Sequence, residues 1–183
     1  KSKRYQTLEL DYVAVKSPQF SYNRLKGADP VASVEMASTG EVACFGDNLT
    51  EAFYKSWLAT DQEVRGKNIC VSLPDEQKHK FLEEVETLVD QGFRLFATSG
   101  TYKYLHNHGV KVTRLYKILE KKEPSLETYI AEQKLDLVVC VPRSDIEDVD
   151  GYTIRRLAID HHIPLMTNAE TGRLLLSALS KYL

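Results

Sequence analysis

From residue 67 onward, short apolar runs rich in β-branched residues alternate with amphipathic stretches of helical length. This alternation is typical of β-α units, whose strands lie parallel in one sheet with helices on both faces. It predicts an α/β fold with three layers, α/β/α, around a five-stranded parallel sheet. The expected strands are 68–73, 93–97, 110–116, 135–141 and 164–167, and the expected helices are 75–91, 101–108, 125–133, 150–161 and 169–182.

The first 60 residues follow a different pattern. They hold two strand-like runs and a capping box that opens a helix, at residues 12–16, 42–45 and 48–51. Two strands and one helix cannot enclose a hydrophobic core of their own. We therefore predict that residues 1–60 are the tail of a preceding domain and that residues 61–183 form the α/β domain. Residues 59–66 are polar and predict an exposed linker.

Charge and hydropathy exclude several classes of partner. The 183 residues carry a formal net charge of -2, which favours neither nucleic acid nor an anionic membrane as a partner. No apolar stretch approaches the roughly 18 residues that a membrane span requires. The chain begins with neither an initiator Met nor a signal sequence, so we expect a piece of a longer, cytoplasmic protein.

The three cysteines are Cys44, Cys70 and Cys140, and each lies in an apolar run with no CxxC spacing. Three cysteines cannot all pair with one another, and cysteines in apolar runs are typical of reduced, buried thiols in a cytoplasmic protein. Cys140 lies at the end of a predicted strand, so we expect mild alkylation to label either Cys140 first or none of the three.

Open parallel sheets bind ligands at the carboxyl ends of their strands. The second predicted strand ends in Thr98-Ser99-Gly100-Thr101, where small hydroxylated residues open a helix. Hydroxyls, free backbone N–H groups and the positive end of a helix together suit a phosphate or a carboxylate. The alternative is that Thr98 or Ser99 only caps the helix and Gly100 only turns the chain.

Basic residues follow three other strands at the same edge. They are Lys78, Lys117 and Arg143, the last just after Cys140. Cations around the hydroxylated loop complete a candidate anion site, although an isolated lysine is more often a solvated surface group. We predict no metal site. The acids at 145, 147, 148 and 150 lack the order of a calcium loop, and the histidines lack ligand spacing.

Several motifs resemble one family. Asp29-Pro30 followed by the octet 35–42 (EMASTGEV) resembles the segment that closes the second ATP-grasp half of the carbamoyl phosphate synthase large chain. The stretches 92–101, 137–139, 150–156 and 163–165 resemble its C-terminal regulatory domain, which is methylglyoxal-synthase-like with a flavodoxin- or Rossmann-like sheet. The resemblance covers essentially the whole chain, and the octet is its most specific part.

The resemblance implies a regulatory piece of a larger ligase. The family's large chain uses ATP to make carbamoyl phosphate from bicarbonate and glutamine-derived ammonia, for pyrimidine and arginine synthesis. Its ATP and Mg²⁺ (or Mn²⁺) sites lie upstream, so the fragment is expected to hold neither cofactors nor catalytic residues. The implied partners are a glutaminase small chain or domain, the rest of the large chain and a small-molecule effector, with a homo-oligomer left open.

The resemblance also implies a ligand. In relatives regulated by nucleotide monophosphates, the phosphate is held by residues that match Lys78, Thr98, Thr101 and Lys117. The family's Asn-x-Thr after the fourth strand reads Cys140-Val141-Pro142 here, which changes the contacts of that segment. Relatives regulated by N-acetylglutamate carry Trp where this chain has Lys117, so the resemblance favours a phosphate-bearing effector.

Two other functions remain open. An active methylglyoxal synthase would act on dihydroxyacetone phosphate with the same sheet and phosphate loop. That family supplies its catalytic base in a Gly-Gly-Asp motif, whereas this chain has Lys-Lys-Glu-Pro-Ser-Leu at residues 121–126 and no such motif elsewhere. The third interpretation is a structural domain that supports oligomerisation without a ligand.

Overall fold

The computed structural model describes residues 10–31, 40–143 and 148–183, and it confirms the predicted α/β class. Five parallel strands form one sheet in the order β5-β4-β3-β6-β7. Their bounds lie within one or two residues of the predicted ones at most ends. They are β3 (Asn68–Ser72), β4 (Arg94–Thr98), β5 (Val112–Leu115), β6 (Leu137–Cys140) and β7 (Leu165–Met166).

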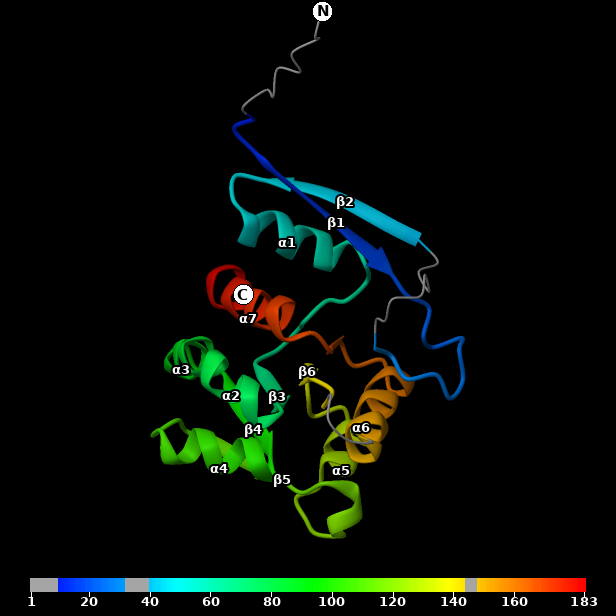
Figure 1. Ribbon diagram of the computed structural model, residues 1–183, viewed down its shortest axis with the longest axis vertical. Helices are drawn as coiled ribbons and strands as arrows, with labels where there is room; N and C mark the ends of the chain where they lie inside the picture. The colour runs from blue at the N-terminus through cyan, green and yellow to red at the C-terminus, as the bar shows by residue number, and fades with distance from the viewer. Residues whose placement is uncertain (1–9, 32–39, 144–147) are drawn as a thin grey trace, which may run out of the picture.

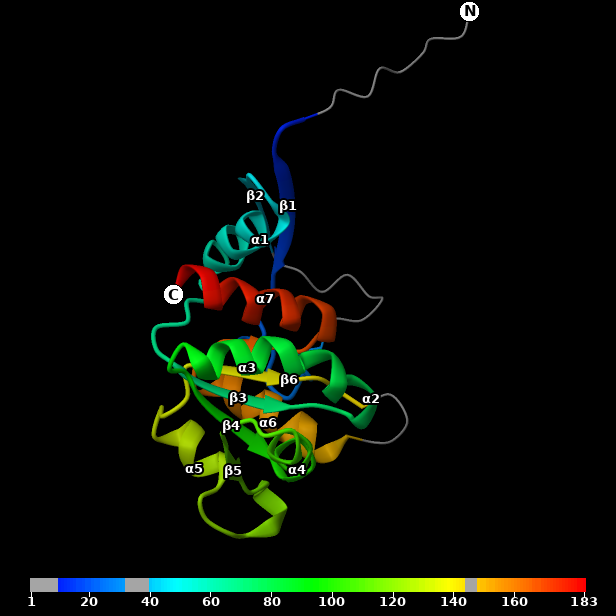
Figure 2. The same ribbon diagram turned by 90° about the vertical axis from the view of Figure 1, so that its left-hand side faces the viewer.

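Helices cover both faces of this sheet (Figures 1 and 2). Ile69 and Val71 of β3 face the core beneath α3 (Leu82–Asp90), α4 (Ser99–Asn107) and α7 (Ala169–Tyr182). Cys70 between them faces a second core, beneath α5 (Leu126–Ala131) and α6 (Val149–Asp160). Because successive side chains of a strand point to opposite faces, an uninterrupted apolar strand supplies both cores.

The predicted helix 75–91 is in three pieces. A four-residue helix, α2 (Asp75–Lys78), leads into a 3₁₀ turn at His79–Phe81, and α3 follows directly. Tighter 3₁₀ turns are frequent at the N-terminal ends of helices. The apolar periodicity predicted one continuous helix and did not distinguish the three pieces. Phe81 is fully buried, so the turn is anchored in the core.

The first part of the chain forms an antiparallel pair, β1 (Val13–Gln19) and β2 (Gly40–Gly46), followed by α1 (Leu49–Leu58). The predicted N-cap is confirmed, because Asn48 Oδ1 accepts a hydrogen bond of 3.0 Å from Glu51 N. The reciprocal bond differs from that of a capping box by one residue, because Glu51 Oε2 accepts its hydrogen bond of 2.8 Å from Asp47 N, the residue before the cap. The specific part of the octet, residues 35–39, lies outside the described residues.

Helix α1 packs on α7 (Figure 1), and Phe53 and Trp57 belong to the same core cluster as Leu175 and Leu179. The domain boundary near residue 60 stays a prediction. The expectation of an exposed linker is wrong at two positions, because Thr60 and Val64 are buried. Thr60 Oγ1 donates 2.7 Å to the carbonyl of Trp57, and Val64 joins the core, so packing holds this connection against the sheet.

Two adjacent arginines of α6 bind the segment between β1 and β2. Arg155 makes two hydrogen bonds to the Asp29 carboxylate, of 2.7 and 2.6 Å. The Nη1 atom of Arg156 donates to backbone carbonyls of the same segment, at Tyr22, Leu25 and Ala28. These contacts join residues about 130 positions apart, so α6 is a second attachment point for the first part of the chain.

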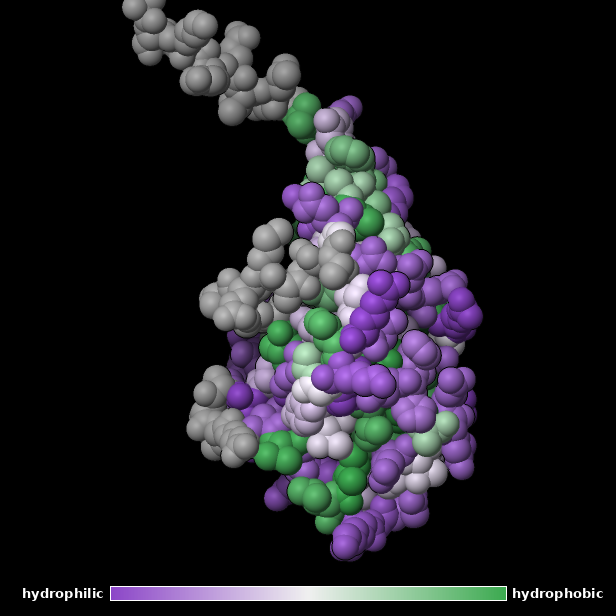
Figure 3. Space-filling view, turned by 90° about the vertical axis from the view of Figure 1, so that its right-hand side faces the viewer, coloured by the Kyte–Doolittle hydropathy of each residue, from purple (hydrophilic) through white to green (hydrophobic). Residues whose placement is uncertain are grey.

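On the face shown in Figure 3, hydrophilic residues cover most of the surface and leave small apolar patches between them. The described residues include no helix that is long and apolar enough to cross a bilayer.

Candidate functional site

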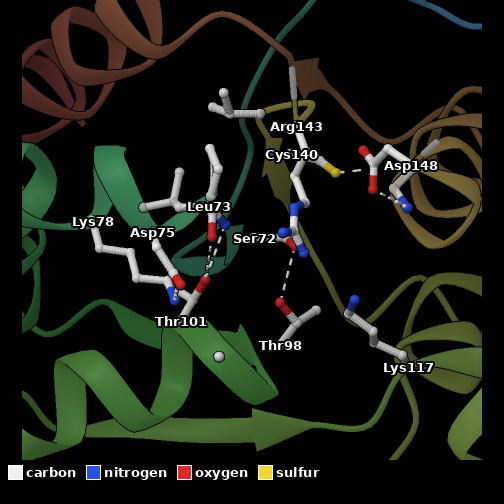
Figure 4. A pocket seen from close by; sticks show the side chains of 14 residues that line it. Ser72, Leu73, Asp75, Lys78, Thr98, Thr101, Lys117, Cys140, Arg143 and Asp148 are labelled. Atoms are coloured by element: carbon white, nitrogen blue, oxygen red, sulfur yellow. Dashed lines mark hydrogen bonds and ion pairs between the residues drawn. The ribbon is translucent and has the colours of Figure 1, made fainter. Parts of the chain in front are cut away.

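A cavity of about 110 Å³ lies at the carboxyl ends of β3, β4 and β6 (Figure 4). This is the edge of the sheet where ligands of parallel folds bind. One water needs about 10–15 Å³ of such space, so a phosphate-sized group fits. Seven of the eight predicted site residues line the cavity: Lys78, Thr98, Gly100, Thr101, Lys117, Cys140 and Arg143.

The N-terminal end of α4 forms the floor of the cavity. Thr98 has extended backbone angles at the N-cap position, and its side chain does not cap the helix. Its hydroxyl instead pairs with Ser72 Oγ at 2.9 Å. The first N–H groups of an α-helix have no carbonyl partner within the helix, so they are suited to an anion. The interpretation of Thr98 as a simple side-chain cap is therefore wrong.

Thr101 joins the first turn of α4 to the end of β3. Its Oγ1 accepts a hydrogen bond of 2.9 Å from Leu73 N and lies 3.3 Å from the Leu73 carbonyl oxygen. The side chain is buried, and these bonds join the first turn of α4 to the chain just after β3. Thr101 therefore positions the helix terminus in addition to lining the cavity.

Lys78 is a buried lysine at the edge of the cavity. It is 6% exposed, so the alternative of a solvated surface group is wrong for this residue. A Cβ atom at position 100 would lie 3.2 Å from its Nζ, so glycine leaves room for the ammonium above the start of α4. Lys78 forms an ion pair with Asp75, three residues earlier in α2. A buried ammonium needs such a partner.

Lys117 approaches from a different side of the cavity (Figure 4). Its Nζ lies 2.9 Å from Asp150 Oδ2, in the first turn of α6. The two lysines therefore place positive charge on separate walls, with the α4 terminus between them. Arg143, which follows β6, also lines the cavity.

Ser99 is the one predicted site residue that does not line the cavity. Its hydroxyl donates 2.8 Å to Glu120 Oε1 and accepts 2.8 Å from Arg114 Nη2. The Arg114–Glu120 ion pair holds the side chain outside the cavity lining. The predicted ligand role of this hydroxyl is thus corrected by a network that joins α4 to residues beyond β5.

The cysteines agree with the prediction of buried, unpaired thiols at Cys70 and Cys140 and differ from it at Cys44. Cys140 lines the cavity wall but is only 1% exposed, so it is not the accessible thiol. Cys44, in the outer pair of strands, is half-buried. Burial raises the pKa of the Cys140 thiol to about 11 and also raises the pKa of Cys70.

A thiol reagent at pH 8 is therefore expected to label Cys44 first. The thiolate is the reactive form, and a raised pKa leaves a smaller thiolate fraction at a given pH. Peptide mass mapping after brief alkylation of the folded protein measures the order, with the urea-unfolded protein as the control in which all three react. Labelling of Cys70 or Cys140 before Cys44 would contradict this order.

The sequence prediction missed several residues of the cavity wall. Asp75 and Asp148 bring negative charge to the site, and Ser72, Leu73, Pro74, Val141 and Gly151 supply other parts of the wall. Ser72 is the last residue of β3 and residues 73–75 directly follow it, so the rule about strand ends could have identified them. Asp148 comes from the start of α6, and no local pattern places it beside β6.

The site can hold an anion by Coulomb attraction, backbone N–H groups and hydroxyls. Within the described residues, no group of three or more His, Cys, Asp or Glu side chains is arranged to bind a metal ion. Asp145 and Glu147 of the acidic loop lie outside those residues.

Comparisons with known proteins agree with the fold and with the motifs. The family model of the MGS-like domain matches residues 80–167. Multifunctional protein URA2 of Saccharomyces cerevisiae is 45% identical over an alignment 183 residues long, which covers 93% of this chain and 8% of that protein. The mitochondrial carbamoyl-phosphate synthase [ammonia] of Homo sapiens is 40% identical over 176 residues, covering 93% of this chain and 12% of that protein.

A methylglyoxal synthase from Elizabethkingia anophelis NUHP1 aligns structurally with a TM-score of 0.47 and 23% identity, covering 61% of this chain and 77% of that one. The curated relatives are far longer than this chain, which spans about a tenth of their length. The identity to them extends through both the first strands and the five-stranded sheet. Residues 80–167 therefore match the MGS-like domain family, within a stretch that is similar to part of carbamoyl-phosphate synthases and multifunctional proteins.

Proposed function

We propose that this chain is the effector-binding region of a carbamoyl phosphate synthase large chain and that its cavity binds the phosphate of a nucleotide monophosphate. The observation that carries the proposal is the position of the α4 N-terminus between Lys78 and Lys117. The side chain of Thr98, the N-cap residue, does not cap this helix. Helix dipole, backbone donors and two cations act on the same small volume. The cavity accommodates the phosphate, and the nucleoside would extend beyond it.

In the intact protein the effector would control carbamoyl phosphate synthesis at ATP and Mg²⁺ sites elsewhere in the large chain, with ammonia from a glutaminase chain or domain. Similarity to the ammonia-type and multifunctional relatives supports this assignment. The route from the cavity to the rest of the large chain would pass through α6, which holds the Asp29 segment. The fragment itself would then be regulatory and non-catalytic, and its cytoplasmic location stays a prediction.

Lys117→Ala is expected to weaken binding of uridine monophosphate about tenfold to a hundredfold, because it removes a charged donor worth about 1.5–3 kcal/mol. Titration calorimetry on the 183-residue chain measures the change. Lys103→Ala is the matched control, since Lys103 is exposed on α4 and does not line the cavity. Uridine, which lacks the phosphate, should bind neither protein measurably.

Equal affinities of Lys117→Ala and wild type would contradict the site. Equal binding of uridine and uridine monophosphate would contradict the phosphate specificity. The same preparations can be assayed for methylglyoxal formation from dihydroxyacetone phosphate. A rate above the uncatalysed one would support the lyase function instead.

A further inference from the structure

The two lysines of the cavity are already paired with carboxylates of the same chain. Asp75 binds the Lys78 ammonium, and Figure 4 shows the two side chains together. Across the cavity, Asp150 Oδ2 lies 2.9 Å from Lys117 Nζ. A phosphate that enters the cavity therefore meets cations whose positions for hydrogen bonding are partly taken.

Asp75 differs from an ordinary structural partner in its exposure. Its side chain is 93% exposed, whereas that of Lys78 is 7% exposed. The carboxylate thus reaches from solvent to the ammonium, in the direction from which a dissolved anion would come. The hydrogen bond from Lys78 lowers the pKa of Asp75, and the charge of Arg143 acts in the same direction. Asp75 is therefore a carboxylate anion at neutral pH.

We propose that Asp75 is an internal competitor that sets the affinity of the cavity for anions. This inference rests on the proposed function, because it concerns the same cavity and the same phosphate. A bound phosphate takes hydrogen bonds of Lys78 from Asp75, and the displaced carboxylate stays close enough to repel it. Both effects weaken binding. Asp150 plays the equivalent part at Lys117, so anion binding is an exchange of ion pairs on both walls.

Asp75→Asn is therefore expected to bind uridine monophosphate about three- to tenfold more tightly than wild type, the reduction in Coulomb repulsion at a partly screened site. A typical loss-of-contact variant at a binding site would change affinity in the opposite direction. Titration calorimetry with uridine monophosphate and with inorganic phosphate measures both affinities. Asparagine keeps a side-chain oxygen that can accept a hydrogen bond from the buried Lys78, which limits the cost to the fold, and a urea unfolding curve of each variant measures that cost.

Glu76→Gln is the matched control. Glu76 is the exposed neighbour of Asp75 on the same short helix, and it does not line the cavity. The substitution removes the same formal charge. If only the Lys78–Asp75 pair matters, the affinity of Glu76→Gln for uridine monophosphate should stay within about twofold of wild type. Asp150→Asn tests the other wall independently, and it should also tighten binding.

The outcomes separate this inference from the proposed function. If wild type binds the anion and Asp75→Asn binds it with equal or lower affinity, the competition is overturned and the anion site stands. Equal tightening in Asp75→Asn and Glu76→Gln overturns it as well, because a general charge effect then suffices. Binding detected only in Asp75→Asn supports both statements. Absence of binding in all variants overturns both.

Discussion

Replacing Arg155 with alanine is expected to lower the free energy of unfolding by about 3–5 kcal/mol, the usual cost of removing one partner of a buried ion pair. The arginine is 1% exposed and is one of the largest fully buried side chains. Its Nη2 lies 2.6 Å from Asp29 Oδ2, and its Nη1 lies 2.8 Å from Asp148 Oδ2. The substitution leaves both carboxylates without this cation and opens a cavity between α6 and β6.

Urea unfolding followed by circular dichroism measures this loss on the 183-residue chain. Arg65→Ala is the control, because the Arg65 side chain is 81% exposed and forms an ion pair with the exposed Glu63. Its expected effect is within about 0.5 kcal/mol. Asp29→Asn should cost less than Arg155→Ala, since the arginine keeps Asp148. A loss below about 1 kcal/mol for Arg155→Ala would show that the three charges contribute little to stability.

Trp57→Ala is expected to lower the free energy of unfolding by about 3 kcal/mol, near the low end for removing a buried aromatic side chain. Trp57 lies on α1 and packs into the cluster that contains Leu175 and Leu179 of α7. It also borders an open groove, so its surroundings lose fewer contacts than those of a fully enclosed residue. The loss should appear in one cooperative transition, because the first part of the chain shares this core.

Trp57 is the only tryptophan, so fluorescence follows α1 in the wild type, and circular dichroism follows the helices in both proteins. Coincident wild-type curves indicate one unit, and separate curves would indicate that residues 1–60 unfold independently. Leu58→Ala serves as the control, because Leu58 is the exposed neighbour of Trp57 on the same helix. A loss for Trp57→Ala no larger than this control would contradict the shared core.

The candidate site was predictable in part, for a local reason. Each parallel strand ends at the same edge, so the residues that follow a strand meet there whatever the loops do. Lys78, Thr98 and Lys117 were found by that rule, and the structure brings them around one cavity. The orientation of Ser99 was not predictable. Its hydroxyl is directed by Arg114 and Glu120, whose own positions depend on how the chain turns after β5.

The sequence by itself determined the five strands, most of the helices and the Asn48 N-cap, because apolar periodicity and cap spacing are local properties that involve residues close together in the chain. Only the tertiary structure decided which charges pair over long distances in the sequence. Asp29 and Arg155 are 126 positions apart, and Lys117 and Asp150 are 33 apart. In these two pairs the packing of helices on the sheet brings the carboxylate within reach of the cation, and no periodicity along the chain records that distance.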